Sequence, residues 1–336
     1  MEKYILYNDD RKVADFCVDS GVIVGYHAQI PELLPMQIKS TAASPDTFML
    51  WLEGRSIDLN TLVHRNMVNE LLGTRDKLTL ALMTHMFSIS DTFTCFREDE
   101  FISRKRLAFP DAQEAVSQYI LVSSDTSLRN LPVVTPNVST DGSFPKTWKY
   151  ETGEWWLYKK QSAIASRCEV EISRVLKQCH WDTAEYKYDG SWRTRVKTKN
   201  FLQPHEFFEP YDSFRFIFSD KRDNDETVYN NIASLGSEYE EAWIRILMAD
   251  AFFENSDRHM RNFGVIRSSV TGEVLRLAPN FDNNQAYLAN PGGIYSGHAL
   301  KEFMQGIGKN YSSWLTILMD AAAEQEFFKQ VVEKVK

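Results

Sequence analysis

The stretch from Glu254 to Gly264, ENSDRHMRNFG, places ionisable and amide side chains directly after an apolar segment, AWIRILMADAFF. Burying such groups without partners costs about 1–3 kcal/mol for each neutral polar group, so folding alone does not explain why they gather there. Asp257 can accept a proton from a hydroxyl, and Asn262 offers an amide oxygen suited to Mg²⁺. Farther along, Asp282 follows a predicted strand, where a second metal-binding carboxylate would stand.

Transfer of a phosphoryl group also needs a cation on the phosphates, and the strand-like run EWWLYKK offers two. Its alternation places Lys159 and Lys160 on opposite faces, so one of them can face a cleft. The following segment, SRCEVEISRVLKQC, has helical spacing and carries Glu169 and Glu171. Two residues apart on a helix, these point in different directions, so only one of them can orient the lysine.

The turn STDGSFPK, residues 139–146, completes the set. Gly142 lies among short polar residues ahead of a strand, where backbone N–H groups can approach phosphate oxygens. Ser143 and Lys146 are further candidate contacts to a nucleotide. Each feature alone fits an ordinary turn, helix cap or solvated lysine. The order of glycine turn, strand lysine, helix glutamate, loop Asp and Asn, and post-strand Asp favours phosphoryl transfer.

Composition narrows the class of protein. The 336 residues carry a formal net charge of -8 and 43% hydrophobic residues, which fits a globular protein without a dominant nucleic-acid surface. No apolar run approaches the roughly 20 residues that span a bilayer, and the first residues do not resemble a signal peptide. The four cysteines form no CxxC pair. We therefore expect a cytoplasmic protein with reduced thiols, no zinc site, no membrane contact and no direct nucleic-acid partner.

Periodicity along the chain predicts an α/β (α+β) protein in three parts. Residues 1–130 combine strand-like pieces with helical spacing and form an N-terminal α/β accessory region. Residues 131–210 form a sheet-rich lobe that includes the glycine turn. Residues 211–336 are mostly helical, apart from a short strand pair that turns at Thr271 and Gly272. A sheet-rich part followed by a helix-rich part indicates two lobes with a cleft between them.

At these residues the sequence resembles the HipA-like serine/threonine kinases, a branch of the protein-kinase-like fold. The resemblance lies in DAFFENSDRHMRNFG (250–264), LAPNFDNNQAY (277–287) and, more loosely, STDGSFPK, and it covers roughly residues 135–336. It implies a two-lobed kinase-like fold that uses ATP and Mg²⁺, with a protein Ser or Thr hydroxyl as acceptor. It implies Asp257 as catalytic base, Asn262 and Asp282 as Mg²⁺ ligands, Lys159 on the phosphates and Glu171 as its ion-pair partner.

Three further residues receive roles at this stage. Ser139 stands where HipA-like kinases carry an autophosphorylated serine, and a phosphate there adds about -1.5 to -2 charges, which should repel ATP. His259 is expected to pin the nucleotide-binding loop by hydrogen bonds, and Arg258 to pair a carboxylate or phosphate. The resemblance also suggests an antitoxin partner.

Two alternatives stay open at the level of sequence. NFDNN replaces the DFG tripeptide of ordinary protein kinases, and the DRHxxN core also resembles phosphoinositide kinases, so a lipid or small-molecule acceptor is one alternative. A nucleotide-binding pseudokinase that acts as a scaffold in a toxin–antitoxin or phage-defence assembly is the other.

Overall fold

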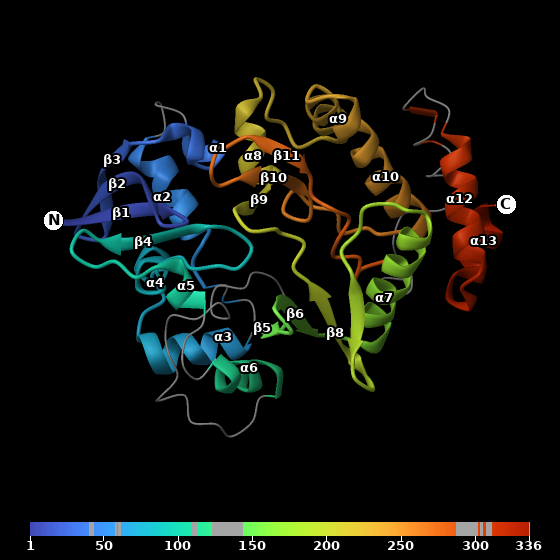
Figure 1. Cartoon of the computed structure of the whole chain (residues 1–336), viewed down its shortest axis with the longest axis horizontal. Coiled ribbons are helices and arrows are strands. Elements are labelled where there is room, and N and C mark those ends of the chain that lie inside the picture. The colour runs from blue at the N-terminus through green and yellow to red at the C-terminus, as the bar shows by residue number, and fades with distance from the viewer. Residues whose placement is uncertain are drawn as a thin grey trace.

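The computed structural model describes residues 1–39, 44–57, 59, 62–108, 113–122, 144–286, 302, 305–306 and 311–335. Within these ranges the chain forms three antiparallel sheets flanked by helices. The first sheet lies at the N-terminal end of the molecule, the other two lie between it and the C-terminal helices, and the two termini lie at opposite ends (Figure 1). None of the described helices is long and apolar enough to cross a membrane.

The first sheet has the strand order β3-β2-β1-β4. Its strands are β1 (Glu2–Asn8), β2 (Arg11–Asp19), β3 (Val22–Ala28) and β4 (Phe93–Arg97). Both faces of β1 are covered: Tyr4 and Leu6 pack in one core, whereas Ile5 and Tyr7 pack in another. A run of apolar residues therefore replaces the alternation of a half-exposed strand.

Short helices complete the N-terminal part. They are η1 (Pro31–Leu33), α1 (Met36–Lys39), α2 (Pro45–Glu53), α3 (Leu62–Met67), the π-helical η2 (Val68–Leu72), α4 (Lys77–Met83), α5 (Arg104–Ala108) and α6 (Gln113–Val122). α2 begins where Ser44 accepts a hydrogen bond from the Thr47 amide at 3.2 Å, with Pro45 at the first helical position. Such a cap stabilises a helix by about 1 kcal/mol.

The second sheet has the order β5-β6-β8-β7 and one long helix, α7 (Ala163–Gln178), packed on it. Its strands are β5 (Lys146–Glu151), β6 (Glu154–Lys160), β7 (Tyr186–Asp189) and β8 (Trp192–Lys199). Ser162 caps α7 by accepting from the Ala165 amide at 3.1 Å. Val170 on α7 meets Tyr186 and Val196 of the sheet. α6 lies on the sheet as well, where Leu121 joins Trp156 and Tyr158 of β6 in a small core.

The third sheet is small, with the order β11-β10-β9, and helices dominate around it. It consists of β9 (Glu206–Pro210), β10 (Gly264–Ser268) and β11 (Val274–Leu277). The helices are α8 (Tyr211–Phe214), η4 (Arg215–Ile217), α9 (Asp225–Ala233), α10 (Ser237–Phe253), α12 (Ser312–Ala323), η5 (Glu326–Phe328) and α13 (Lys329–Val335). This arrangement confirms the predicted fold class: a sheet-rich lobe, a mostly helical lobe and an additional N-terminal α/β part.

A buried ion pair fastens the N-terminal part to the third sheet. The guanidinium of Arg267 is fully buried and lies 2.6 Å from the carboxylate of Glu209. It also donates to the carbonyls of Glu32 and Leu34, both at 2.9 Å. The two backbone segments approach so closely that a Cβ on Gly272 would lie 1.9 Å from the Glu32 carbonyl oxygen. Glycine at 272 is therefore required by space as well as by its φ of +78°.

We predict that Arg267→Ala lowers the free energy of unfolding by about 3–5 kcal/mol, because it leaves the Glu209 carboxylate buried without its cation. Denaturant titration measures the loss, and hydrogen exchange should speed up in residues 31–39. Arg11→Ala is the matched control, since Arg11 also bridges the two parts, to the Val270 carbonyl at 3.1 Å, but from an exposed position. Equal effects of the two substitutions would contradict the role given to Arg267.

Candidate active site

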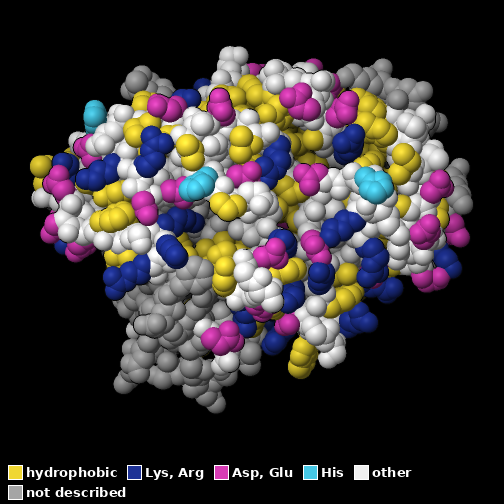
Figure 2. Space-filling model, in the orientation of Figure 1, with side chains coloured by type: hydrophobic (Ala, Val, Ile, Leu, Met, Phe, Trp, Pro, Cys, Tyr) yellow, Lys and Arg dark blue, Asp and Glu magenta, His cyan; other side chains and the backbone are white. Residues whose placement is uncertain are grey.

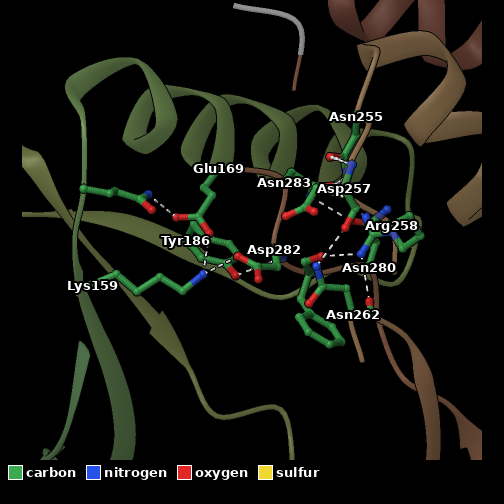
Figure 3. Close-up of polar contacts among 12 residues, drawn as sticks. Lys159, Glu169, Tyr186, Asn255, Asp257, Arg258, Asn262, Asn280, Asp282 and Asn283 are labelled. Atoms are coloured by element: carbon green, nitrogen blue, oxygen red, sulfur yellow. Dashed lines mark hydrogen bonds and ion pairs between the residues drawn. The ribbon is translucent and has the colours of Figure 1, made fainter. Parts of the chain in front are cut away.

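The C-terminal end of β6 places Lys159 between two carboxylates. Its ammonium lies 2.7 Å from Glu169 of α7 and 2.6 Å from Asp282, and the lysine side chain is only 5% exposed. Burial alone would lower the pKa of Lys159, but the charges of Asp282 and Glu169 outweigh it and raise that pKa well above its ordinary value. The lysine is therefore a permanent cation at the meeting point of sheet, helix and loop (Figure 3).

The partner of Lys159 on the helix is Glu169, so the prediction of Glu171 is wrong. Glu169 is fully buried on the face of α7 that meets the sheet, and its second oxygen accepts from Gln161 at 2.5 Å. Two residues are about 200° of helical rotation, so Glu171 points away from the sheet and pairs with Arg174 instead. The prediction that only one of the two glutamates meets the lysine is confirmed.

Asp282 follows β11 and adopts an unusual backbone conformation. Its φ of +61° lies in the left-handed region, which Asp tolerates better than most residues, and its amide donates to the Tyr186 hydroxyl at 3.2 Å. Burial favours the neutral acid, yet the positive charges of Lys159 and Lys146 hold the pKa of Asp282 well below its ordinary range. A partly buried carboxylate that stays ionised can bind a cation at any physiological pH.

The loop after α10 carries the second group of predicted residues. α10 ends at Glu254, whose φ of +55° turns the chain out of the helix. The Asn262 side-chain amide donates to the Asp257 carbonyl at 2.9 Å, and the Asn262 backbone N–H donates to the His259 carbonyl at 2.8 Å. These bonds close the loop into a compact turn and engage the nitrogen of the Asn262 amide, so its oxygen is the atom that could ligate a cation.

Arg258 links this loop to the loop that carries Asp282. Its guanidinium pairs with Asp250 of α10 through two bonds of 2.8 Å. The same group donates to the carbonyls of Asn262 at 2.8 Å and Phe281 at 2.6 Å, and to the Asn283 side chain at 2.9 Å. The expectation that Arg258 pairs a carboxylate is confirmed. The sequence signal for its partner was a lone Asp at 250 within an apolar helix.

The pKa of Asp257 shifts in the opposite direction from that of Asp282. Burial raises the pKa of Asp257; among the nearby charges, His259 and Arg258 lower it and Asp282 raises it, with a net upward shift. In Figure 3 Asp257 and Asn262 approach Asp282 from one side, and Lys159 and Glu169 approach it from the other. Carboxylates and cations from four segments, namely β6, α7, the loop after α10 and the loop after β11, thus meet in one place.

The donor set fits a magnesium ion better than a soft metal. Asp282 and Asn262 supply hard oxygen atoms, and Mg²⁺ usually takes one or two carboxylates together with water and phosphate oxygens. Within the described ranges there is no group of three or more His, Cys, Asp or Glu residues that could hold a metal ion. A cage made of protein ligands alone is therefore not what these residues form.

Comparison with known proteins identifies the architecture. Neither a protein-family model nor a curated protein sequence matches the chain. Among solved structures, HipA from the toxin–antitoxin system of Shewanella oneidensis MR-1, in complex with HipB and operator DNA, matches with a TM-score of 0.66. The match covers 99% of this chain and 90% of that chain, at 12% sequence identity.

The chain has a HipA-like fold. A second solved structure, the proinflammatory kinase CtkA of Helicobacter pylori, matches with a TM-score of 0.39 over 56% of this chain and 86% of that chain, at 14% identity. At these identities the likeness describes the arrangement of the elements, and the chemistry has to be argued from the residues.

The remaining predicted residues are distributed unevenly in this HipA-like fold. Lys146 begins β5 directly opposite Lys159 in the ladder, and its charge acts on Asp282. His259 is exposed, and its ring accepts a hydrogen bond from the Arg261 amide at 3.2 Å, as expected of a residue that pins the loop. Ser139, Gly142 and Ser143 lie outside the described residues, so their assignments stay predictions.

We predict that Glu169→Ala lowers the free energy of unfolding by about 3 kcal/mol or more, because it removes one of two carboxylates around a buried ammonium. Glu171→Ala should change it by about 0–1 kcal/mol, since Arg174 in that pair is half exposed. Denaturant titration of the two variants measures the difference. A larger loss for Glu171→Ala would reverse the assignment of the lysine's partner.

Proposed function

We propose that the protein is a kinase that uses ATP and Mg²⁺ and transfers the γ-phosphate to a Ser or Thr hydroxyl of a protein. The observation that carries this proposal is the ion pairing of Lys159 with both Glu169 and Asp282. Asp257 and Asn262 lie beside this group (Figure 3). Phosphoryl transfer relies on positioning and charge neutralisation. This set supplies a cation for phosphate, hard oxygen ligands and a proton acceptor.

Each residue in the set has one task in the proposed reaction. Lys159, oriented by Glu169, binds phosphate oxygens as a point charge, and Lys146 adds a second cation at the same edge of the sheet. Asp257 orients the acceptor hydroxyl and takes its proton. Asp282 and Asn262 would hold Mg²⁺, which supplies neutralisation of the phosphate charge. Arg258 touches no reacting atom in this scheme and positions the two loops.

The proposal includes modification of the enzyme by itself and a protein partner. Ser139 is the proposed autophosphorylation site, where a phosphate would repel the phosphates of ATP. The HipA of Shewanella oneidensis that shares this fold was solved with HipB and operator DNA. By analogy, we propose that this chain also has a partner with an antitoxin role; any contact with DNA is left to experiment.

We predict that the purified protein, with γ-labelled ATP and Mg²⁺, labels itself on a hydroxyl side chain. Asp257→Asn and Asp282→Asn should each lower the rate about 100-fold or more, because they remove the proton acceptor and a metal ligand. Asp212→Asn is the matched control, since that aspartate is half exposed on α8 and pairs with Arg215. Mass spectrometry of the protein identifies the labelled residue.

Different outcomes of that assay favour different functions. ATP binding without any label on protein or on added substrates would favour the nucleotide-binding scaffold. Label only on added phosphoinositides or small molecules would indicate that the phosphate acceptor is not a protein. Full activity in both Asp257→Asn and Asp282→Asn would refute the assigned roles.

We also predict an acid limb in the pH dependence of the transfer rate. Asp257 accepts a proton only when ionised, and its raised pKa places the loss of activity above the ordinary Asp value of about 3.9. His259→Gln removes a charge that lowers this pKa, so the limb should move to higher pH. His27→Gln, an exposed histidine on β3, serves as control. A limb that stays in place or moves to lower pH in His259→Gln would contradict the role of Asp257.

A further inference from the structure

A cavity of about 670 Å³ lies beside α7, and neither Lys159, Glu169 nor Asp282 lines it. Its wall includes Ile164, Arg167 and Glu171 of α7, Tyr188 of β7, Arg193 of β8 and Phe327 of η5. α7, the following strands β7 and β8, and the distant η5 therefore build it. The size falls in the range of clefts that take small molecules or a few side chains of a peptide.

The lining combines apolar surface with positive charge. The guanidinium of Arg167 lies 4.2 Å from the centre of the Phe327 ring, and that of Arg193 lies 4.4 Å from the centre of the Tyr188 ring. Neither arginine forms an ion pair with a carboxylate of the described ranges, whereas Glu171 is already paired with Arg174. Both arginines are exposed, so each can still donate hydrogen bonds to an acceptor.

The ligand chemistry follows from this combination. A guanidinium that stacks on a ring keeps its edge N–H groups free for a carboxylate, which it binds through two parallel bonds. Ile164, half exposed at 49%, and Phe327 offer an apolar contact in the same cavity. A free inorganic anion would leave that apolar wall unused. Figure 2 shows Lys and Arg side chains gathered over α7 and β8 with hydrophobic side chains between them.

We propose that this cavity is a docking site for a short segment of a partner protein that carries an apolar side chain next to carboxylates. The apolar side chain packs between Ile164 and Phe327, and the carboxylates pair with Arg167 and Arg193. The charge complementarity of two arginines that have no carboxylate partner in the described ranges is the argument for an acidic segment. The apolar wall is the argument for a peptide.

Occupancy of the cavity acts on the helix that orients Lys159. α7 supplies both the cavity wall and Glu169, and Tyr188 packs in the same cluster as Tyr186 and Phe281, next to Asp282. A ligand that binds the conformation described here stabilises it, with Glu169 in place. Docking itself does not depend on the proposed kinase activity and is tested without it.

Disulfide capture tests the docking site on the full chain. Ala163→Cys places a thiol in the cavity wall, in a Cys17→Ser background, because Cys17 is partly exposed and the other three cysteines are buried. The probes are three peptides with an N-terminal 3-mercaptopropionyl group, which supplies the thiol. Their sequences are Gly-Phe-Glu-Glu, Gly-Phe-Gln-Gln and Gly-Phe-Lys-Lys. Mass spectrometry of the intact protein measures the concentration of 2-mercaptoethanol at which half of each disulfide adduct is lost. Leu275→Cys, an exposed position on β11, is the control for non-specific capture.

We expect the adduct of the Glu peptide with the Ala163→Cys protein to resist at least five-fold more reductant than that of the Gln peptide. The Leu275→Cys protein should show no preference between the two peptides. Arg167→Ala and Arg193→Ala should each abolish the preference at position 163. Arg245→Ala should keep it, because Arg245 also lies over a ring, that of Trp314, but does not line the cavity. Hydrogen exchange of α7 should slow in the captured Glu adduct.

Several results would overturn the proposal. Equal capture of the Glu and Gln peptides would contradict the proposed pairing of carboxylates with Arg167 and Arg193. A preference that survives both arginine substitutions would contradict it as well. Preference for the Lys peptide would indicate a basic partner instead. If the adduct of free 3-mercaptopropionate were as stable as that of the Glu peptide, the ligand would be a small organic anion and not a protein segment.

Discussion

The candidate site depends on one buried guanidinium. Arg258 neutralises Asp250 on α10 and at the same time holds the carbonyls of Asn262 and Phe281, so it fixes two loops relative to one helix. Removal of one member of such a buried pair costs about 3–5 kcal/mol. The positions of Asp257 and Asp282 therefore follow from a residue that needs no contact with substrate, and its rigid fork of donors explains why a lysine could not replace it.

Two carboxylates of the candidate site have opposite pKa shifts, and the difference fits the separate tasks proposed for them. Asp282 lies against Lys159 and stays ionised, which suits a ligand for a cation. Asp257 has a raised pKa, which suits a group that exchanges a proton. Pairs of titratable groups whose environments push their pKa values apart are a common sign of divided roles in acid–base chemistry. Burial raises both pKa values; it prevails at Asp257, whereas the neighbouring lysines outweigh it at Asp282.

Much of this arrangement was predictable from sequence, because it depends on local patterns. Alternation identified β6 and placed Lys159 and Lys160 on opposite faces, whereas the choice of Lys159 came from the family resemblance. The polar run after α10 identified Asp257 and Asn262. The choice between Glu169 and Glu171 was not predictable, because it depends on the rotation of α7 about its axis, which is set by packing on the sheet. The contacts of Arg267 with the carbonyls of Glu32 and Leu34 left no trace in side-chain patterns, since any residue supplies a carbonyl.

The bond from Arg267 to the Leu34 carbonyl also has a consequence for the order of folding, because it spans 233 positions of the chain. At roughly 5–20 residues per second, a ribosome adds that length in about 10–50 s. During this time the early sheet of β1 to β4 can form, but the carbonyls of Glu32 and Leu34 have no guanidinium to accept from. The N-terminal part is therefore synthesised first, but its contacts with Arg267 form last. Contacts between residues so far apart in sequence favour slow completion of the native structure.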